Sequence, residues 1–230
     1  MKRVETRETD LDIKSVMLND KREIYLNDDY GIEILMVFGG RTLHKILPSY
    51  PEGGYGGGSL YLSPCDSYLI FSYYSGQSQE AFNLYRISDK LEMVYEMPYI
   101  CGEAASYGFS TDEKILIQGL PISCTADWWH PWRDEEMDED ENGNLFFDFG
   151  QINILDIEKK QVSQHMIRIF PSNDWNPQED DFDPLMLPEM TSDDTLKVSM
   201  PWGDEILKFP LMNTIDFKVI NDSFKAVFLG

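Results

Sequence analysis

The chain has 230 residues, of which 42% are hydrophobic and 13% aromatic, so it can bury a sizeable core and is not globally disordered. It carries 19 Lys and Arg residues against 41 Asp and Glu residues, a net charge of −22. Such a field repels phosphate backbones and anionic lipids, so we expect neither nucleic-acid nor membrane binding, and a basic protein or a cation fits better. Residues 1–14 are charged throughout and no run approaches 18 apolar residues, which predicts a cytoplasmic protein.

Short segments with alternating apolar residues follow one another along the chain, separated by clusters of turn-forming residues, and no sustained helical periodicity develops. This pattern predicts an all-β protein. Four stretches begin alike, with a strand, a polar turn and a second strand, at residues 15–26, 59–72, 106–118 and 185–199. Each is followed by a further pair of strands, which we expect at residues 34–47, 84–95, 152–167 and 206–220.

These segments form a weak repeat with uneven spacing. The apolar residue at the same place in each third strand steps from Leu35 to Leu84, Ile154 and Leu207, with separations of 49, 70 and 53 residues. Two separations lie just above the roughly 40–50 residues of a propeller blade, and the longest contains an insertion. A surplus strand at residues 223–229 is expected to pair with an N-terminal edge and so close a ring.

The turns inside the second and third stretches are similar in sequence. One reads Ser63-Pro-Cys-Asp66 before the strand 68–71, and the other reads Ser110-Thr-Asp-Glu113 before the strand 115–117. Ser and Asp side chains suit such turns because they hydrogen-bond the turn backbone. The pattern resembles the turn of WD-repeat and related β-propellers, although the Gly-His and Trp-Asp dipeptides of true WD repeats are absent. The resemblance covers residues 12–220 only loosely.

The resemblance implies a single domain over residues 1–230, a small β-propeller-like array of about four four-stranded antiparallel units. A β-sandwich or a barrel of the same short strands is the alternative, because alternation alone fits all three. In the propeller, alternation should bury one face of each first and second strand. The residues expected to be buried there are Leu60, Leu62, Leu69, Phe71, Phe109, Ile115, Ile117, Leu196 and Val198.

An insertion at residues 119–144 departs most from the repeat. Binding and catalytic residues often lie in such insertions, so we look for functional residues there first. Three of the five tryptophans of the chain lie close together in it, followed by a run of acids. Tryptophan is frequent among interface hot spots, and neighbouring acids select a cationic target. The alternative is that the tryptophans cap the fold and the acids solvate a loop. With a second acidic and aromatic segment at residues 173–184, the candidate partner-binding residues are Trp128, Trp129, His130, Trp132, Asp134, Glu135, Glu136 and Trp175.

Asp138, Asp140 and Asn142, followed by Gly143, match most of the calcium-loop pattern D-x-[DN]-x-[DN]-G, in which alternate side chains bring oxygens to one ion. The twelfth position, however, is Phe149 in place of a bidentate Glu. The alternative is a solvated hairpin turn, and Asn142-Gly143 suits a type I′ geometry. Calcium at Asp138, Asp140 and Asn142 is the one metal or cofactor that the sequence suggests.

The sequence contains no motif for catalysis. The histidines His44, His130 and His165 lie apart without metal spacing, and a structural role is expected for His44 and His165. The glycine-rich stretch 53–58 lacks the Lys-Ser/Thr of a phosphate loop. We therefore predict a non-enzymatic module that presents an acidic, aromatic face to a basic protein, such as an immunity or inhibitor protein against a cationic toxin. The alternatives are a carbohydrate-active or calcium-dependent hydrolase and a scaffold subunit of an assembly.

Overall fold

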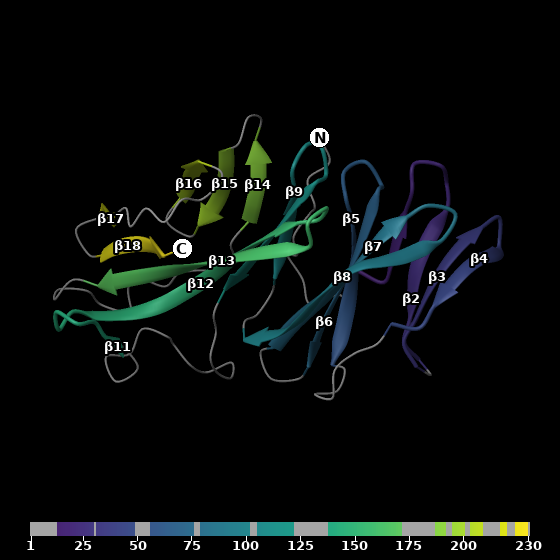
Figure 1. The fold of residues 1–230 in the computed structure, drawn as a ribbon. Coiled ribbons are helices and arrows are strands. Elements are labelled where there is room, and N and C mark those ends of the chain that lie inside the picture. The colour runs from purple at the N-terminus through teal and green to yellow at the C-terminus, as the bar shows by residue number, and fades with distance from the viewer. Residues whose placement is uncertain are drawn as a thin grey trace. The chain divides into compact units, whose positions relative to one another are not determined.

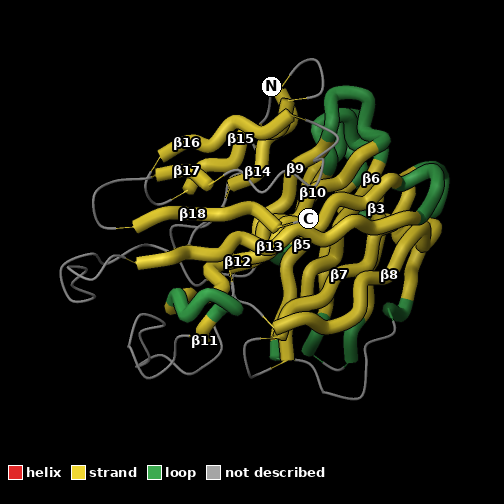
Figure 2. Tube along the Cα trace, turned by 60° about the vertical axis from the view of Figure 1, so that its left-hand side comes forward, coloured by secondary structure: helices red, strands yellow, loops and turns green. Residues whose placement is uncertain are grey.

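A computed structural model describes residues 13–29, 31–48, 56–75, 79–101, 105–121, 138–171, 187–191, 195–200, 203–208, 217–219 and 224–229. These residues form antiparallel sheets and contain no helix, so the protein is all-β, as the alternation predicted (Figures 1 and 2). The chain divides into two compact units, Met1–Ile100 and Cys101–Gly230. The single domain over residues 1–230 stays a prediction.

The first unit contains two four-stranded sheets in which each strand pairs with the next one along the chain. The first sheet consists of β1 (Ser15–Met17), β2 (Glu23–Asn27), β3 (Glu33–Phe38) and β4 (Arg41–Ile46). The second sheet consists of β5 (Gly57–Leu62), β6 (Tyr68–Ser75), β7 (Gln79–Ile87) and β8 (Leu91–Cys101). Both sheets are meanders, and their strands overlap the segments expected from the repeat.

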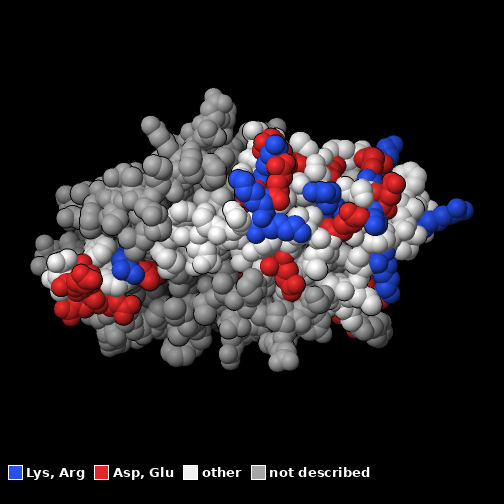
Figure 3. All heavy atoms as spheres, in the orientation of Figure 1, with Lys and Arg blue, Asp and Glu red and all other residues white. Residues whose placement is uncertain are grey.

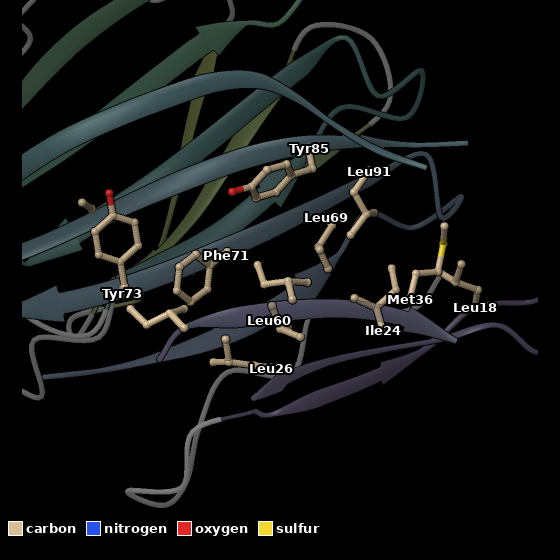
Figure 4. Packing of buried hydrophobic residues seen from close by; sticks show 13 residues of the cluster. Leu18, Ile24, Leu26, Met36, Leu60, Leu69, Phe71, Tyr73, Tyr85 and Leu91 are labelled. Carbon is tan, nitrogen blue, oxygen red and sulfur yellow. The ribbon is translucent and has the colours of Figure 1, made fainter. Parts of the chain in front are cut away.

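Alternating apolar residues of these two sheets form one core (Figure 4). Ile34 of the first sheet and Leu60, Leu69 and Phe71 of the second are fully buried, at 0% exposure. Complete burial of a side chain of this size contributes about 1.5–3 kcal/mol. The burial predicted for the three residues of the second sheet is confirmed, while Leu62 at the end of β5 is partly buried.

Two side chains link the sheets of the first unit at their turns. Arg22, after β1, donates from Nη1 to the carbonyl oxygen of Ser88 in the β7–β8 turn, and from Nε to Asp20 at 2.7 Å. His44 of β4 accepts a hydrogen bond at Nδ1 from the backbone N–H of Leu91 at 3.1 Å. His44 therefore joins β4 to the first residue of β8, in agreement with the structural role expected for it.

In the second unit, four strands pair in the order of a third meander: β9 (Ser106–Phe109), β10 (Ile115–Pro121), β12 (Leu145–Asp156) and β13 (Gln161–Pro171). A two-residue strand, β11 (Asp138–Glu139), pairs with the first two residues of β12. The C-terminal strands β18 (Phe224–Leu229) and β17 (Phe217–Val219) continue this sheet beyond β13. Phe109 and Ile117 are buried as predicted, and Ile115 is partly buried.

The C-terminal strands differ from the expected repeat. A three-stranded sheet contains β14 (Leu187–Thr191), β15 (Thr195–Met200) and β16 (Gly203–Lys208), and the side chains of Leu196 and Val198 lie outside the described residues. The fourth strand predicted within 206–220 does not join it, because β17 pairs with β18. The prediction that the surplus strand pairs with an N-terminal edge is wrong, since β18 pairs with β13. This pairing satisfies the N–H and C=O groups that the edge of β13 would otherwise expose.

The first turn of each meander has the same backbone geometry. Lys21, Asp66 and Glu113 have φ angles of 69°, 58° and 55°, and each donates its N–H to the carbonyl three residues earlier, at 3.0, 3.0 and 2.9 Å. In the second and third turns, Ser63 and Ser110 accept at Oγ from the backbone N–H five residues later, at 2.9 and 3.0 Å. The role predicted for these serines is confirmed. A propeller-like arrangement of WD-repeat-like blades stays a prediction.

Candidate functional site

The hairpin of β11 and β12 carries the last part of the insertion predicted at residues 119–144. Asp138 of β11 lies opposite Phe146 of β12, and Glu139 lies opposite Leu145. Opposite residues of an antiparallel pair point to the same face of the sheet, so Asp138 and Phe146 share one face and Glu139 and Leu145 share the other. Figure 3 shows acidic side chains gathered over this hairpin, at the left of the view.

Asp140 holds the turn of the hairpin. Its Oδ1 accepts hydrogen bonds from the backbone N–H groups of Asn142 at 2.8 Å and Asn144 at 2.9 Å, and Nδ2 of Asn144 donates to Oδ2 at 2.9 Å. Gly143 donates its N–H to the Asp140 carbonyl at 3.0 Å and has a φ of 80°, which favours glycine. These bonds, foremost those from the Asn144 side chain, hold the pKa of the Asp140 carboxyl below its ordinary value. The turn is therefore fixed by a carboxylate that stays ionised.

The remaining acids of the hairpin face water. Asp138, Glu139 and Glu141 are exposed, and the neighbouring Leu145 has 45% of its surface exposed. Within the described part of the chain, no ion pair neutralises these three carboxylates. Carboxylates on neighbouring residues repel one another, and a nearby cation relieves the repulsion. The tip can therefore accept charge-assisted hydrogen bonds from Lys or Arg side chains, with an apolar side chain beside them.

Four side chains at the base of the hairpin form a cluster, which we call the Arg168 cluster: Phe146 and Asp148 from β12, Arg168 and Phe170 from β13. Arg168 donates from Nε to Oδ1 of Asp148 at 2.8 Å and from Nη2 to Oδ2 at 3.4 Å. Its guanidinium carbon lies 3.6 Å from the ring centroid of Phe146, which is itself 5.6 Å from that of Phe170. The Arg168 and Asp148 side chains are 25% and 30% exposed, so water only partly screens the pair.

The predicted calcium residues all lie on this hairpin, Asp138 in β11 and Asp140 and Asn142 in the turn. Both oxygens of Asp140 accept hydrogen bonds of the turn, and a cation there would compete with these bonds for the carboxylate. Among the described residues, no three His, Cys, Asp or Glu side chains are grouped to hold a metal ion. The type I′ form suggested for the alternative hairpin turn is wrong, because Gly143 has a positive φ and Asn142 does not. Calcium binding stays a prediction.

The candidate partner-binding residues lie outside the described residues: Trp128, Trp129, His130, Trp132, Asp134, Glu135, Glu136 and Trp175. The structure does fix where the insertion leaves the sheet and where it rejoins it. The chain leaves β10 at Pro121, which lies opposite Gly150 of β12, and it returns through β11. Both described residues that flank residues 122–137, Pro121 and Asp138, therefore lie on strands that pair with β12.

His165 lies in the interior of the second unit, where a structural role was expected for it. It belongs to β13 opposite Ile152 of β12, and 7% of its surface is exposed. Its Nε2 lies 3.2 Å from Oγ of Ser163. Burial lowers the pKa of the His165 imidazole, so the neutral ring is favoured in the folded protein.

Sequence reasoning missed Asn144 and the Arg168 cluster. Arg168 and Asp148 are 20 positions apart, and their pairing depends on the register of β12 against β13. The sequence does place Phe146 two residues before Asp148 and Phe170 two residues after Arg168, which puts each pair on one face of its strand. With the register known, that alternation would have identified the cluster.

Comparisons with known proteins assign no family to this chain. No protein family model matches it, and no curated protein matches it either. Among solved structures it is similar to an uncharacterized protein of Listeria monocytogenes EGD-e, at 9% sequence identity and a TM-score of 0.39, over 89% of this chain and 69% of that one. A likeness this loose carries no argument about fold or function. In the described ranges, no helix has the length and apolar character needed to cross a membrane.

Proposed function

We propose that this protein is a non-enzymatic, cytoplasmic binding module that presents an acidic, aromatic face to a basic protein. The observation that carries the proposal is the β11–β12 hairpin, where the exposed acids Asp138, Glu139 and Glu141 stand on a turn held by Asp140. Carboxylates on a fixed turn lose little conformational entropy when a cationic partner binds, which favours affinity. The tryptophans of the insertion, which lie outside the described residues, would supply apolar anchors.

The net charge of −22 supports the same class of partner. A negative field attracts a basic protein and raises its association rate, most strongly at low ionic strength. A specific version of the proposal is an immunity or inhibitor protein that neutralises a cationic toxin such as a nuclease. The carboxylates of the hairpin would then occupy the places of substrate phosphates on the toxin surface.

A propeller-like array with WD-repeat-like blades is the scaffold that we propose for this face. The meander order of three sheets and the shared turn geometry at Lys21, Asp66 and Glu113 support it. Such an array would hold the insertion on a rigid sheet, and rigid elements present binding residues more accurately than loops do. A crystal structure with the sheets arranged around one axis would establish the array, and sheets packed as a single sandwich would contradict it.

A titration with a defined cationic probe tests the proposed function. The probe is a labelled peptide of alternating Arg and Gly residues, and fluorescence anisotropy at low ionic strength gives its Kd. The hairpin-neutral variant, Asp138→Asn with Glu139→Gln and Glu141→Gln, keeps Asp140 and changes the net charge to −19 (−22 + 3). We expect its Kd to be about tenfold higher, because exposed ion pairs contribute up to about 1 kcal/mol each.

A matched control separates the hairpin from the general charge of the protein. Asp89→Asn with Glu92→Gln and Glu158→Gln also gives −19 (−22 + 3) but removes exposed acids outside the hairpin. We expect this control to raise Kd less than about twofold, because screening weakens the contribution of distant charges. Equal losses in the two variants would contradict the proposal, since affinity would then follow net charge alone.

A further inference from the structure

The strand that carries the acidic hairpin is irregular at its base. From Asp156 back to Gly150, β12 pairs with β13 in continuous register, and the register shifts between Gly150 and Asp148. A β-bulge of this kind places an extra residue in one strand, bends it and increases its twist. The direction of the β11–β12 hairpin therefore depends on the contacts that β12 makes beyond the bulge.

The Arg168 cluster makes these contacts. Asp148, directly opposite Arg168, receives two N–H groups of the guanidinium, whose face also covers the ring of Phe146 at 3.6 Å. A planar guanidinium can pair with a carboxylate along one edge while it stacks on an aromatic ring, and its fork restricts the orientation of the carboxylate. A Lys ammonium at the same place has neither the fork nor the flat face.

We propose that Arg168 is a positioning residue, which fixes the direction in which the hairpin presents Asp138, Glu139 and Glu141 to a cationic partner. This inference rests on the proposed function and assigns it a determinant outside the acidic tip. Arg168 acts through Asp148 and Phe146, not by contact with the partner, because its Nε and Nη2 groups already donate to Asp148 and its face lies on the ring.

A change in net charge alone would alter Kd in the opposite direction to a loss of positioning. Replacing Arg168 with a neutral residue changes the net charge from −22 to −23 (−22 − 1), which strengthens the general attraction for a cation. If the direction of the hairpin matters, the same replacement weakens binding, because the carboxylates at the tip are no longer held in one arrangement. The direction in which Kd changes therefore distinguishes positioning from general electrostatics.

The experiment compares Arg168→Gln with Lys159→Gln in the full chain, with the same Arg-Gly peptide. Lys159 lies in the turn at the other end of β12 and β13, pairs with Asp156 at 2.7 Å and is 70% exposed, so its replacement removes the same charge without touching the cluster. We expect Arg168→Gln to raise Kd about fivefold, as the loss of roughly 1 kcal/mol would do, and Lys159→Gln to leave it unchanged or lower it.

Arg168→Lys provides a second variant, which keeps the net charge and serves if Arg168→Gln does not fold by circular dichroism. Its Kd should also rise, and amide residual dipolar couplings of residues 138–144 should change while those of 151–167 do not. Binding by Arg168→Lys as tight as that of wild type, binding by a folded Arg168→Gln as tight as that of Lys159→Gln, or unchanged hairpin couplings would overturn the inference. The hairpin-neutral variant separates the two proposals. If it binds the peptide as tightly as wild type does, the proposed function fails. If it binds more weakly while the Arg168 variants keep their affinity, only the positioning role of Arg168 is refuted.

Discussion

At the start of β5, the side chain of Tyr74 leaves no room for a Cβ atom at two consecutive positions, Gly56 and Gly57. An ideal Cβ on Gly57 would lie 2.4 Å from Oη of Tyr74, and one on Gly56 would lie 2.9 Å from Cδ2 of the same ring. Both distances are shorter than the contacts that real Cβ atoms make. The N–H of Gly56 also donates to the Tyr74 carbonyl at 2.7 Å, which keeps the two strands close. Close packing against Tyr74 in the sheet therefore explains why glycine occupies these two positions of the stretch 53–58.

A substitution at Gly57 should therefore destabilise the first unit. Gly57→Ala places a methyl group against the ring of Tyr74, a residue that is 37% exposed, at a φ of 158° that side chains rarely adopt. We therefore expect a loss of about 1 kcal/mol or more in the free energy of unfolding. Urea denaturation measures the change. In a double-mutant cycle, Tyr74→Ala should remove the part of the penalty that the clash causes, while the part that the φ of 158° causes should remain. Fully additive effects of the two substitutions would show that the clash contributes nothing.

His165 should make stability depend on pH. Burial lowers its pKa in the folded state, whereas the unfolded chain keeps the ordinary value of about 6.5, so the unfolded state binds more protons as the pH falls. The contribution of His165 is fully present above that value and is lost as the pH drops toward the folded pKa. Between about pH 7.5 and pH 5.5, wild type should lose more stability than His165→Gln in urea denaturation. Parallel curves for the two proteins would contradict this prediction.

At the scale of elements, turns as well as apolar faces connect the two sheets of the first unit. Asp66, in the β5–β6 turn, accepts a hydrogen bond at Oδ2 from the backbone N–H of Asn19, in the β1–β2 turn, at 2.5 Å. A carboxylate that accepts from a backbone N–H forms a charge-assisted bond, which is stronger than a neutral one. Because Asp66 also has a φ of 58°, a replacement must tolerate the left-handed conformation.

The contact between these turns predicts the outcome of two substitutions at one position. Asp66→Ala removes the acceptor and places Ala in a left-handed conformation, and we expect it to lower the free energy of unfolding by about 1 kcal/mol or more. Asp66→Asn keeps both an acceptor oxygen and tolerance of that conformation, so it should cost clearly less. Thermal unfolding of the two variants provides the comparison. Equal losses would assign the role of Asp66 to its charge.

Much of the fold could be predicted because strands follow local alternation. Alternation located β5 and β6 and predicted burial of Leu60, Leu62, Leu69 and Phe71. The prediction is confirmed for all of them except Leu62, which is partly buried. The place of β18 could not be predicted, since its pairing with β13 joins distant segments and depends on which edge is unpaired. Alternation determines which face of a strand is buried but carries no information about its neighbour.

The candidate site was predictable only in part. The spacing of Asp138, Asp140 and Asn142 identified the turn, because oxygen-bearing side chains before a glycine favour a sharp bend in the chain. It did not show that the Asn144 side chain would donate hydrogen bonds to both carboxylate oxygens of Asp140. Arg168 escaped notice because its partner is fixed by strand register, which a single sequence does not specify around a bulge.

At the scale of the whole molecule, the described acids differ in how they are paired. In the first unit, Lys14 pairs with Asp28 at 2.6 Å and Lys90 pairs with Glu92 at 2.7 Å. At the tip of the β11–β12 hairpin, by contrast, no described cation pairs with the exposed acids, and Figure 3 shows acidic residues gathered at the left of the view. A cationic partner therefore gains most where the carboxylates have no cation of their own.

Hydrogen–deuterium exchange of the full chain, with and without the Arg-Gly peptide at low ionic strength, tests most directly where a cationic partner binds. Bound segments exchange more slowly because their amides are shielded and their local opening is suppressed. The account predicts slower exchange within residues 122–148, from the insertion through the hairpin to the base of β12, with little change elsewhere. Protection confined to other segments, or spread evenly along the chain, would contradict it.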